Sequence, residues 1–340
     1  MGKPLLQVKD LCVEFGSRKR PVRVLDHVDL HLNAGEILGV VGESGCGKSM
    51  TSLSILRLVP SPPGRITQGT IELEGTDLLR LSETRMQDVR GNDIAMIFQE
   101  PMTALNPVFT IGRQITETLI RHQRLSAEQA RRKALELVES VYIPEPAKRL
   151  DQYPFELSGG MRQRAMIAMA LACRPKVLIA DEPTTALDVT VQAQIFDLLL
   201  ELREKHGTAI ILITHNMGAI AELADRVMVM YAGRKIEEGS VGEVLLEPRH
   251  PYTRGLLDCV LQVEHDPSKF SPEALPEIPG VVPPLDQLGK GCAFAPRCAR
   301  VMDKCRTEHP PMLGEPDRGA ACWLLDEAPA ASAADKEVLV

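Results

Sequence analysis

The sequence has few aromatic residues, no excess of basic residues and no long apolar run. Aromatic side chains make up 4 % of the 340 residues, too few for the stacking surfaces on which single-stranded nucleic acid binds. Acidic residues outnumber basic ones by 46 to 39, so a broad electropositive surface is not expected either. The longest apolar run, Ala165 to Cys173, has nine residues, whereas a helix that spans a bilayer needs about 18 to 20. We therefore expect a chain that binds no nucleic acid and does not itself cross a membrane.

The two ends of the chain differ in composition. The start, MGKPLLQVKDLCVEF, alternates apolar with polar residues instead of forming a signal-peptide core, which predicts a cytosolic location. Of the 25 prolines, 13 lie at or beyond Pro248, and four of the eight cysteines lie between Cys292 and Cys322. This shift predicts a boundary near residue 240, with a Pro/Cys-rich module over 241–328 and a flexible tail over 329–340.

Before that boundary, short β-branched runs alternate with helical patterns. The runs are EILGVVG, KVLIADE, TAIILITH and RVMVMY. Continuous apolar strands separated by helices are typical of a parallel sheet that is covered on both faces. The predicted fold class is therefore α/β for residues 1–240.

A phosphate-binding pattern follows the first of these strands. Residues 42 to 49 read GESGCGKS, which fits G-x-x-x-x-G-K-[ST] between a strand and a helix. Glycines let backbone N–H groups converge on phosphate oxygens, and the helix N-terminus adds its positive end. Lys48 is expected to reach the β- and γ-phosphates, and Ser49 to ligate Mg²⁺. The predicted nucleotide-binding residues here are Gly42, Glu43, Ser44, Gly45, Cys46, Gly47, Lys48, Ser49 and Met50.

The partner carboxylates are predicted at the end of KVLIADE. Asp181 is placed to hold the Mg²⁺ shell, and Glu182 to polarise the attacking water as general base. The stretch from Gly47 to Asp181 is longer than one crossover needs, which predicts an inserted helical subdomain over about 90–170. Within it, Ser126 and Gln129 form a predicted capping box. Ser158, Gly159 and Gly160 open a further helix, where a second anion site and a plain helix cap are both open interpretations.

Taken in order, these motifs resemble the ATP-binding cassette ATPases. The sequence carries GESGCGKS, Gln99 in MIFQEP, LSGGM, LIADEP, Asp188 in TALD and His215 in LITHN. The resemblance implies a head-to-tail dimer in which one cassette's phosphate loop and the other's Ser158, Gly159, Gly160 and Met161 enclose each ATP. It also implies that Phe15 stacks on adenine, although a core aromatic of the first strand is the alternative.

The same resemblance assigns roles to three further residues. Gln99 joins the Mg²⁺ and the attacking water, His215 contacts the γ-phosphate, and Asp188 forms the D-loop. The sequence departs from the usual cassette motifs at two positions. Met161 stands where many cassettes have glutamine, and Asn216 stands where many have aspartate. Neither change removes a catalytic group.

A narrower resemblance covers residues 5 to about 325. QEPMTALNPVFTIGRQI and PRHPYTRGLL look like the ATPase subunits of dipeptide and oligopeptide importers, and GCAFAPRCARVMDKCRTEHPP with Cys322 looks most like the D-type subunit of dipeptide permeases. This implies a heterodimer with a related F-type ATPase subunit, two integral membrane permease subunits, a substrate-binding protein and a peripheral place on the cytoplasmic face of the inner membrane. Oligopeptides, haem, nickel complexes and peptide-like antibiotics are alternative cargoes. A soluble cassette ATPase acting on DNA or ribosomes, or an iron–sulfur sensor that only binds nucleotide, are alternative functions.

The four late cysteines predict a small metal-held module. Cys292, Cys298, Cys305 and Cys322 are separated by five, six and sixteen residues. Disulfides are not expected in a reducing compartment. Paired C-x₂₋₄-C spacing, which zinc favours, is missing, so the spacing favours a [4Fe–4S] cluster; zinc and free or partly oxidised thiols are the alternatives. Because none of these cysteines belongs to an ATP motif, we expect the module to leave nucleotide binding unaffected.

Overall fold

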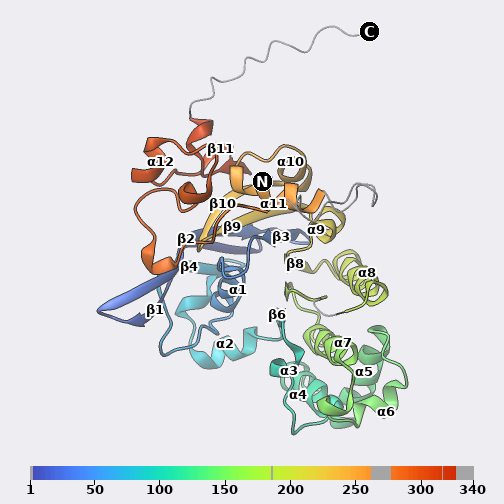
Figure 1. The fold of residues 1–340 in the computed structure, drawn as a ribbon. Helices are drawn as coiled ribbons and strands as arrows, with labels where there is room; N and C mark the ends of the chain where they lie inside the picture. Colours follow the sequence, from blue (N-terminus) through green and yellow to red (C-terminus); the bar gives the residue numbers. More distant parts are fainter. Residues whose placement is uncertain (1–2, 185–186, 262–276, 316, 327–340) are drawn as a thin grey trace, which may run out of the picture.

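An eight-stranded sheet forms the centre of the computed structural model, which describes residues 3–184, 187–261, 277–315 and 317–326 (Figure 1). Its strand order is β11-β12-β10-β9-β3-β8-β7-β6. The five strands from β9 to β6 in this order are parallel to one another, and β10, β12 and β11 add to the sheet in antiparallel fashion. The strands are β3 (Ile37–Val41), β6 (Ile94–Ile97), β7 (Val177–Asp181), β8 (Ala209–Ile213), β9 (Arg226–Tyr231), β10 (Arg234–Ser240), β11 (Leu313–Glu315) and β12 (Arg318–Ala320).

Both faces of the parallel strands are buried, which explains why their sequences are continuously apolar. Leu38 and Val40 of β3 face a core that they share with the N-terminal strands. Ile37 and Val41, which point the other way, belong to a core built with helices. The prediction of a doubly covered parallel sheet is confirmed.

A second, four-stranded antiparallel sheet covers one of those faces, and the sequence did not predict it. Its order is β2-β1-β4-β5. Irregular pairing interrupts β1 near Asp10 and Cys12. The strands are β1 (Leu6–Ser17), β2 (Arg20–Leu32), β4 (Arg65–Leu73) and β5 (Thr76–Asp77).

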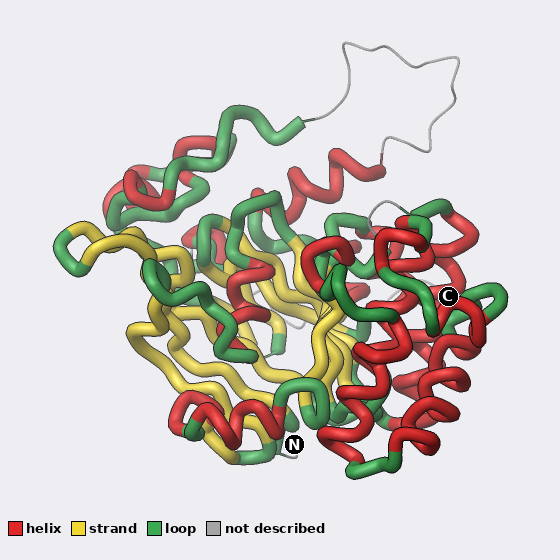
Figure 2. Tube along the Cα trace, turned by 90° about the horizontal axis from the view of Figure 1, so that it is seen from below, coloured by secondary structure: helices red, strands yellow, loops and turns green. Residues whose placement is uncertain are grey.

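Helices between β6 and β7 gather at one end of the molecule, on the lower right of Figure 1 and on the right of Figure 2. In α5 the capping box of Ser126 and Gln129 is present as predicted. Ala130, Ala134 and Val138 of the same helix are buried, at the four-residue spacing that places them on one helix face. The helices of this group are α3 (Pro101–Ala104), α4 (Ile111–Gln123), α5 (Ala127–Ser140), α6 (Pro146–Leu150) and α7 (Gly159–Leu171).

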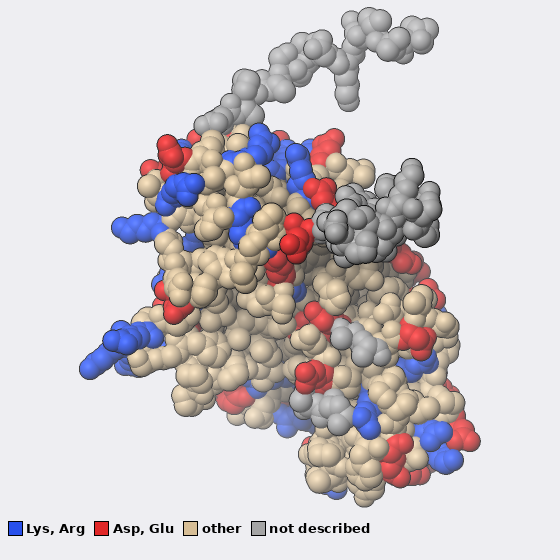
Figure 3. Space-filling view, viewed as in Figure 1, with Lys and Arg blue, Asp and Glu red and all other residues tan. Residues whose placement is uncertain are grey.

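The remaining helices surround the two sheets. They are α1 (Lys48–Ile55), α2 (Glu83–Val89), α8 (Val189–His206), α9 (Met217–Leu223), α10 (Val241–Leu246), α11 (Pro251–Leu261) and α12 (Asp303–Thr307). Among the described helices, none combines the length and the apolar character that a bilayer span requires. On the face drawn in Figure 3, acidic and basic side chains are interspersed.

The region after residue 240 packs on the cassette instead of folding apart from it. Strand β12 pairs with β10, so the C-terminal hairpin extends the central sheet. Tyr252 and Phe294 belong to the larger of the two cores. The predicted tail over 329–340 lies outside the described residues.

Candidate functional site

The phosphate-binding pattern forms a tight loop between β3 and α1. Gly42 has φ +147°, and a Cβ there would lie 2.2 Å from the Met230 carbonyl oxygen. Gly47, with φ +104°, is the residue from which α1 begins, and a Cβ there would lie 2.7 Å from Leu25 Cδ2. Both positions therefore require glycine on steric grounds. Ser44 and Gly45, at the rim of the loop, are exposed.

Lys48 folds back over this loop. Its Nζ donates to the carbonyl oxygens of Gly42 at 2.7 Å and of Glu43 at 3.0 Å, and the residue is 7 % exposed. The side chain of Cys46 is buried, and burial raises the pKa of its thiol. A buried ammonium group beside a loop of backbone groups is suited to bind an anion. Met50 is partly buried against the core beneath the loop.

Asp181 ends β7 close to the start of α1. Burial raises the pKa of Asp181, and the nearby Ser49 hydroxyl offsets part of that rise. Within the part of the chain that the structure describes, Asp181 Oδ1 is buried without a hydrogen-bond partner. A buried carboxylate oxygen without a partner next to a hydroxyl fits the hard oxygen ligands that Mg²⁺ prefers.

Three predicted catalytic residues meet at the carboxyl ends of neighbouring strands. Gln99 follows β6, Glu182 follows β7 and His215 follows β8. The Gln99 Nε2 donates to Glu182 Oε2 at 3.0 Å, and His215 Nδ1 lies 3.5 Å from Glu182 Oε1. The side chain of Glu182 is 17 % exposed, that of His215 is 73 % exposed. A shielded carboxylate that is held by an amide and lies next to an exposed imidazole can orient a water molecule and accept its proton.

Glu182 also has an unusual backbone. Its φ is +47°, in the left-handed region, and its N–H donates to the Ile213 carbonyl at 2.9 Å. A non-glycine residue pays about 1 to 3 kcal/mol for such a conformation. The strand pairing therefore fixes where the carboxylate points.

The serine and glycines of LSGGM form the start of α7, in the helical group between β6 and β7 (Figure 1). Ser158 caps α7, with its Oγ accepting from Met161 N at 3.3 Å. Ser158 and Gly159 are exposed, and a Cβ on Gly159 would have nothing within 4 Å. The cap that one interpretation predicted is present, and the exposed helix N-terminus stays available to a second molecule.

The remaining predicted residues have simple local settings. Phe15 is half-buried against the core of the antiparallel sheet, near Gly64. Asp188 caps α8 by accepting from Val191 N at 2.9 Å. Asn216, at a position where the sequence departs from many cassettes, caps α9 by accepting from Ala219 N, a role that Asp fills equally well.

The four late cysteines line one small cavity, which also includes His250 and Trp323. Burial, with smaller contributions from the nearby Cys305 and Cys322, raises the pKa of Cys292 to about 11. The same cause, burial, raises the pKa of Cys298 and of Cys322. Four thiols that line one cavity are the kind of ligand that a metal cluster takes.

Two residues that the sequence analysis did not single out contact the phosphate loop. Arg297, next to Cys298, pairs with Glu43 at 2.7 Å and 3.0 Å. Tyr252 Oη accepts from Glu43 N at 2.8 Å. Folding thus brings a residue next to Cys298 into contact with the phosphate loop, across 254 positions of sequence. Whether the module affects nucleotide binding stays a prediction.

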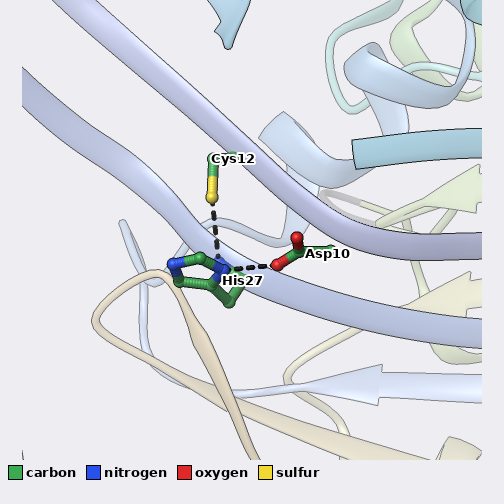
Figure 4. Close-up of side chains that lie close together, drawn as sticks. All are labelled: Asp10, Cys12 and His27. Carbon is green, nitrogen blue, oxygen red and sulfur yellow. Dashed lines mark hydrogen bonds and ion pairs between the residues drawn. The ribbon is translucent and has the colours of Figure 1, made fainter. Parts of the chain in front are cut away.

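A separate cluster of possible metal ligands lies between β1 and β2 (Figure 4). The ligand atoms of Asp10, Cys12 and His27 lie within 4.8 Å of one another. His27 Nδ1 is already paired with Asp10, and the His27 N–H donates to Cys12 Sγ at 3.4 Å. Burial raises the pKa of the Cys12 thiol. These groups satisfy one another and tie two strands together outside the candidate site.

Two family models match the chain. The "ABC transporter" model matches residues 25–185, which include the phosphate loop and Glu182. The model for "Oligopeptide/dipeptide transporter, C-terminal region" matches residues 236–305, which include Tyr252 and Arg297.

Curated proteins and solved structures are similar over most of their lengths. A probable peptide ABC transporter ATP-binding protein of Sinorhizobium fredii is 52 % identical, covering 95 % of this chain and 96 % of its own. The oligopeptide transport ATP-binding protein AppD of Bacillus subtilis is 49 % identical, covering 95 % of this chain and 97 % of its own. The dipeptide transport ATP-binding protein DppD of Escherichia coli is 47 % identical, covering 95 % of this chain and 98 % of its own. The dimeric ATP-binding cassette MJ0796 bound to ADP and Pi superposes with a TM-score of 0.64 at 27 % identity, covering 69 % of this chain and 98 % of its own.

Proposed function

This chain belongs to the ATP-binding proteins of peptide ABC transporters, and on that basis we propose that it hydrolyses ATP to energise the import of dipeptides or short peptides. The observation that carries the proposal is the meeting of Gln99, Glu182 and His215 beside the phosphate loop and Asp181. A protein that only bound nucleotide would have no use for a shielded carboxylate held in this way.

In this proposal the phosphate loop binds ATP. The backbone N–H groups of the loop and Lys48 hold the phosphates, and Phe15 stacks on the adenine. Ser49 and Gln99 ligate Mg²⁺ with Asp181 in its shell, and the ion neutralises phosphate charge. Glu182 accepts a proton from the attacking water, and His215 contacts the γ-phosphate.

The site is completed by a second cassette. Ser158, Gly159, Gly160 and Met161 lie at the start of α7, where Ser158 and Gly159 are exposed. They would serve the phosphate loop of a partner, with Asp188 at the contact. ATP then joins the two cassettes and hydrolysis releases them. We propose a related F-type ATPase subunit as that partner, so that the two cassettes would form a heterodimer.

Coupling to the membrane would use the helical group α3–α7, the proposed inserted subdomain of a cassette over 1–240. The loop before α4 exposes Val108, and the neighbouring Tyr153 and Phe155 are exposed and stacked, with ring centroids 5.5 Å apart. Exposed apolar side chains grouped in this way favour docking of another protein. Two membrane permease subunits, served by a substrate-binding protein, would place the chain on the cytoplasmic face of the inner membrane.

A photo-activated crosslinking residue in place of Pro107 tests this docking. Pro107 is exposed in the loop before α4, and we expect its crosslinks in the assembled transporter to reach a membrane subunit. The same crosslinker at Leu246, which is 83 % exposed on α10, is the control and is expected not to reach it. Crosslinks from Pro107 only to the second cassette would contradict the docking surface and leave the ATPase assignment standing.

We also propose that Cys292, Cys298, Cys305 and Cys322 hold a [4Fe–4S] cluster in the module over 241–328, with zinc as the alternative. The support is the shared cavity of the four thiols. Such a cluster would supply covalent cross-links where a small region has little core of its own.

Anaerobically purified protein is therefore expected to be brown and to contain about four irons and four sulfides per chain. Cys298→Ser should remove the colour and most of the iron, whereas Cys173→Ser, outside the cavity, should leave both unchanged. Colourless anaerobic protein with one equivalent of zinc would assign the site to the alternative metal.

A further inference from the structure

Every polar group of Glu43, the second residue of the phosphate loop, is held. Its N–H donates to Tyr252 Oη at 2.8 Å, and its carbonyl oxygen accepts from Lys48 Nζ at 3.0 Å and from Cys46 N at 3.3 Å. Its two carboxylate oxygens accept from Arg297, Nη1 to Oε2 at 2.7 Å and Nη2 to Oε1 at 3.0 Å. The groups that hold Glu43 thus come from the loop itself and from the C-terminal region.

Arg297 is in turn fixed by its own surroundings. Its side chain is 4 % exposed, whereas the Glu43 side chain is 27 % exposed. Besides Glu43, its guanidinium donates to the carbonyls of Pro279 at 2.9 Å and Ile278 at 3.1 Å. A planar guanidinium that binds a carboxylate through two parallel N–H groups sets orientation as well as position, which a lysine cannot do.

Aromatic packing joins the same residues to the cysteine cavity. Tyr252 and Phe294 both pack against Tyr231, with ring centroids 4.7 Å and 5.4 Å from it. Phe294 and His250 line the cavity that holds the four thiols. Arg297 immediately precedes Cys298, a residue of that cavity. The segment that carries Cys292 and Cys298 therefore also carries Arg297, which holds the Glu43 carboxylate.

We propose that Arg297 is a positioning residue for ATP binding. It holds Glu43, so that a well-ordered four-cysteine module keeps the phosphate loop in its binding conformation. This rests on the proposed role of the loop in binding ATP. A loop that is already held in its binding conformation loses less freedom when the nucleotide arrives, so its affinity is higher. Loss of the group held by the thiols would loosen residues 292–298 and, through Arg297, the loop.

Arg297→Gln in the full-length chain tests the first step. We expect its Kd for a fluorescent ATP analogue to rise about tenfold, the scale expected when a charge-assisted pair is lost. The Kd of Arg297→Lys should lie between those of the wild type and Arg297→Gln, because lysine keeps the charge but cannot make the bidentate contact. Arg254→Gln is the matched control: Arg254 is exposed on α11, two residues after Tyr252, and its Nη2 donates to the Pro248 carbonyl. Its Kd should stay at the wild-type value.

A double-mutant cycle separates this route from general damage. Glu43→Gln added to Arg297→Gln should raise Kd no further, because both changes remove one contact. Cys298→Ser alone should raise the Kd to the level of Arg297→Gln. When Arg297 is already replaced by Gln, Cys298→Ser should not raise the Kd any further. The thermal midpoint of Arg297→Gln should stay within a few degrees of wild type.

Three results would overturn the inference. These are a wild-type Kd in Arg297→Gln, an equal loss in Arg254→Gln, and a Cys298→Ser effect that persists in full when Arg297 is already replaced. Failure of the wild-type chain to bind ATP is a different result, because it would refute the proposed function instead.

Discussion

Glu182→Gln is expected to stop ATP turnover while leaving ATP bound. The substitution keeps the size of the side chain and its contact with Gln99 Nε2, which now lies 3.0 Å from Glu182 Oε2. It removes the group that accepts a proton from water, a loss that typically costs about 10² to 10⁴ in rate. Phosphate release by the assembled transporter should fall by that factor, provided that the partner cassette is inactivated in all samples.

The binding readout makes this prediction specific. Glu182→Gln should bind ATP with the wild-type Kd and accumulate an ATP-bound cassette dimer, detectable by size-exclusion chromatography. Glu201→Gln, an exposed carboxylate on α8, should change neither rate nor dimer content. Near-normal turnover in Glu182→Gln would remove Glu182 from the mechanism and leave Lys48 and the phosphate loop as a binding site.

Lys48→Ala is expected to weaken the binding of ATP, in contrast to Glu182→Gln, which acts on its hydrolysis. Lys48 Nζ now lies between the carbonyl oxygens of Gly42 and Glu43, and it is the cation that can turn to the phosphates. A lost hydrogen bond to a charged group costs about 1.5 to 3 kcal/mol, so the Kd for ATP should rise by about tenfold to a hundredfold.

Isothermal titration with ATP and Mg²⁺ measures this change directly. Lys205→Ala, an exposed lysine on α8 paired with Glu201, is the control and should bind like wild type. An unchanged Kd in Lys48→Ala would place the nucleotide elsewhere, whereas a raised Kd in both variants would point to a general effect of charge.

Local patterns predicted most of the catalytic geometry because it is built at strand ends. Glycine spacing identified the loop at Gly42 and Gly47, where the structure has φ values that glycine alone adopts easily. The family resemblance, not a local pattern, singled out Gln99 and His215. They meet Glu182 because β6, β7 and β8 are parallel neighbours whose carboxyl ends share one edge of the sheet. The capping box at Ser126 was equally local.

Contacts between distant segments were not predictable in the same way. The antiparallel sheet was missed because the alternation at the start of the chain does not show which strands β1 pairs with, and β4 lies about sixty residues further along the chain. The contact of Arg297 with Glu43 has no periodic signature, since it depends on how α11 and the cysteine segment pack on β9. Ser158 is a different case: its proposed partner belongs to a second molecule.

The most direct test of an importer ATPase is to identify what the chain assembles with. A tagged copy, expressed from its own locus and purified from mild detergent extracts of the membrane, should bring down its untagged partners for mass spectrometry. The account predicts two polytopic permease subunits and a second, related cassette in comparable amounts. Recovery of the chain with ribosomal or DNA-bound proteins, and without a membrane subunit, would contradict it.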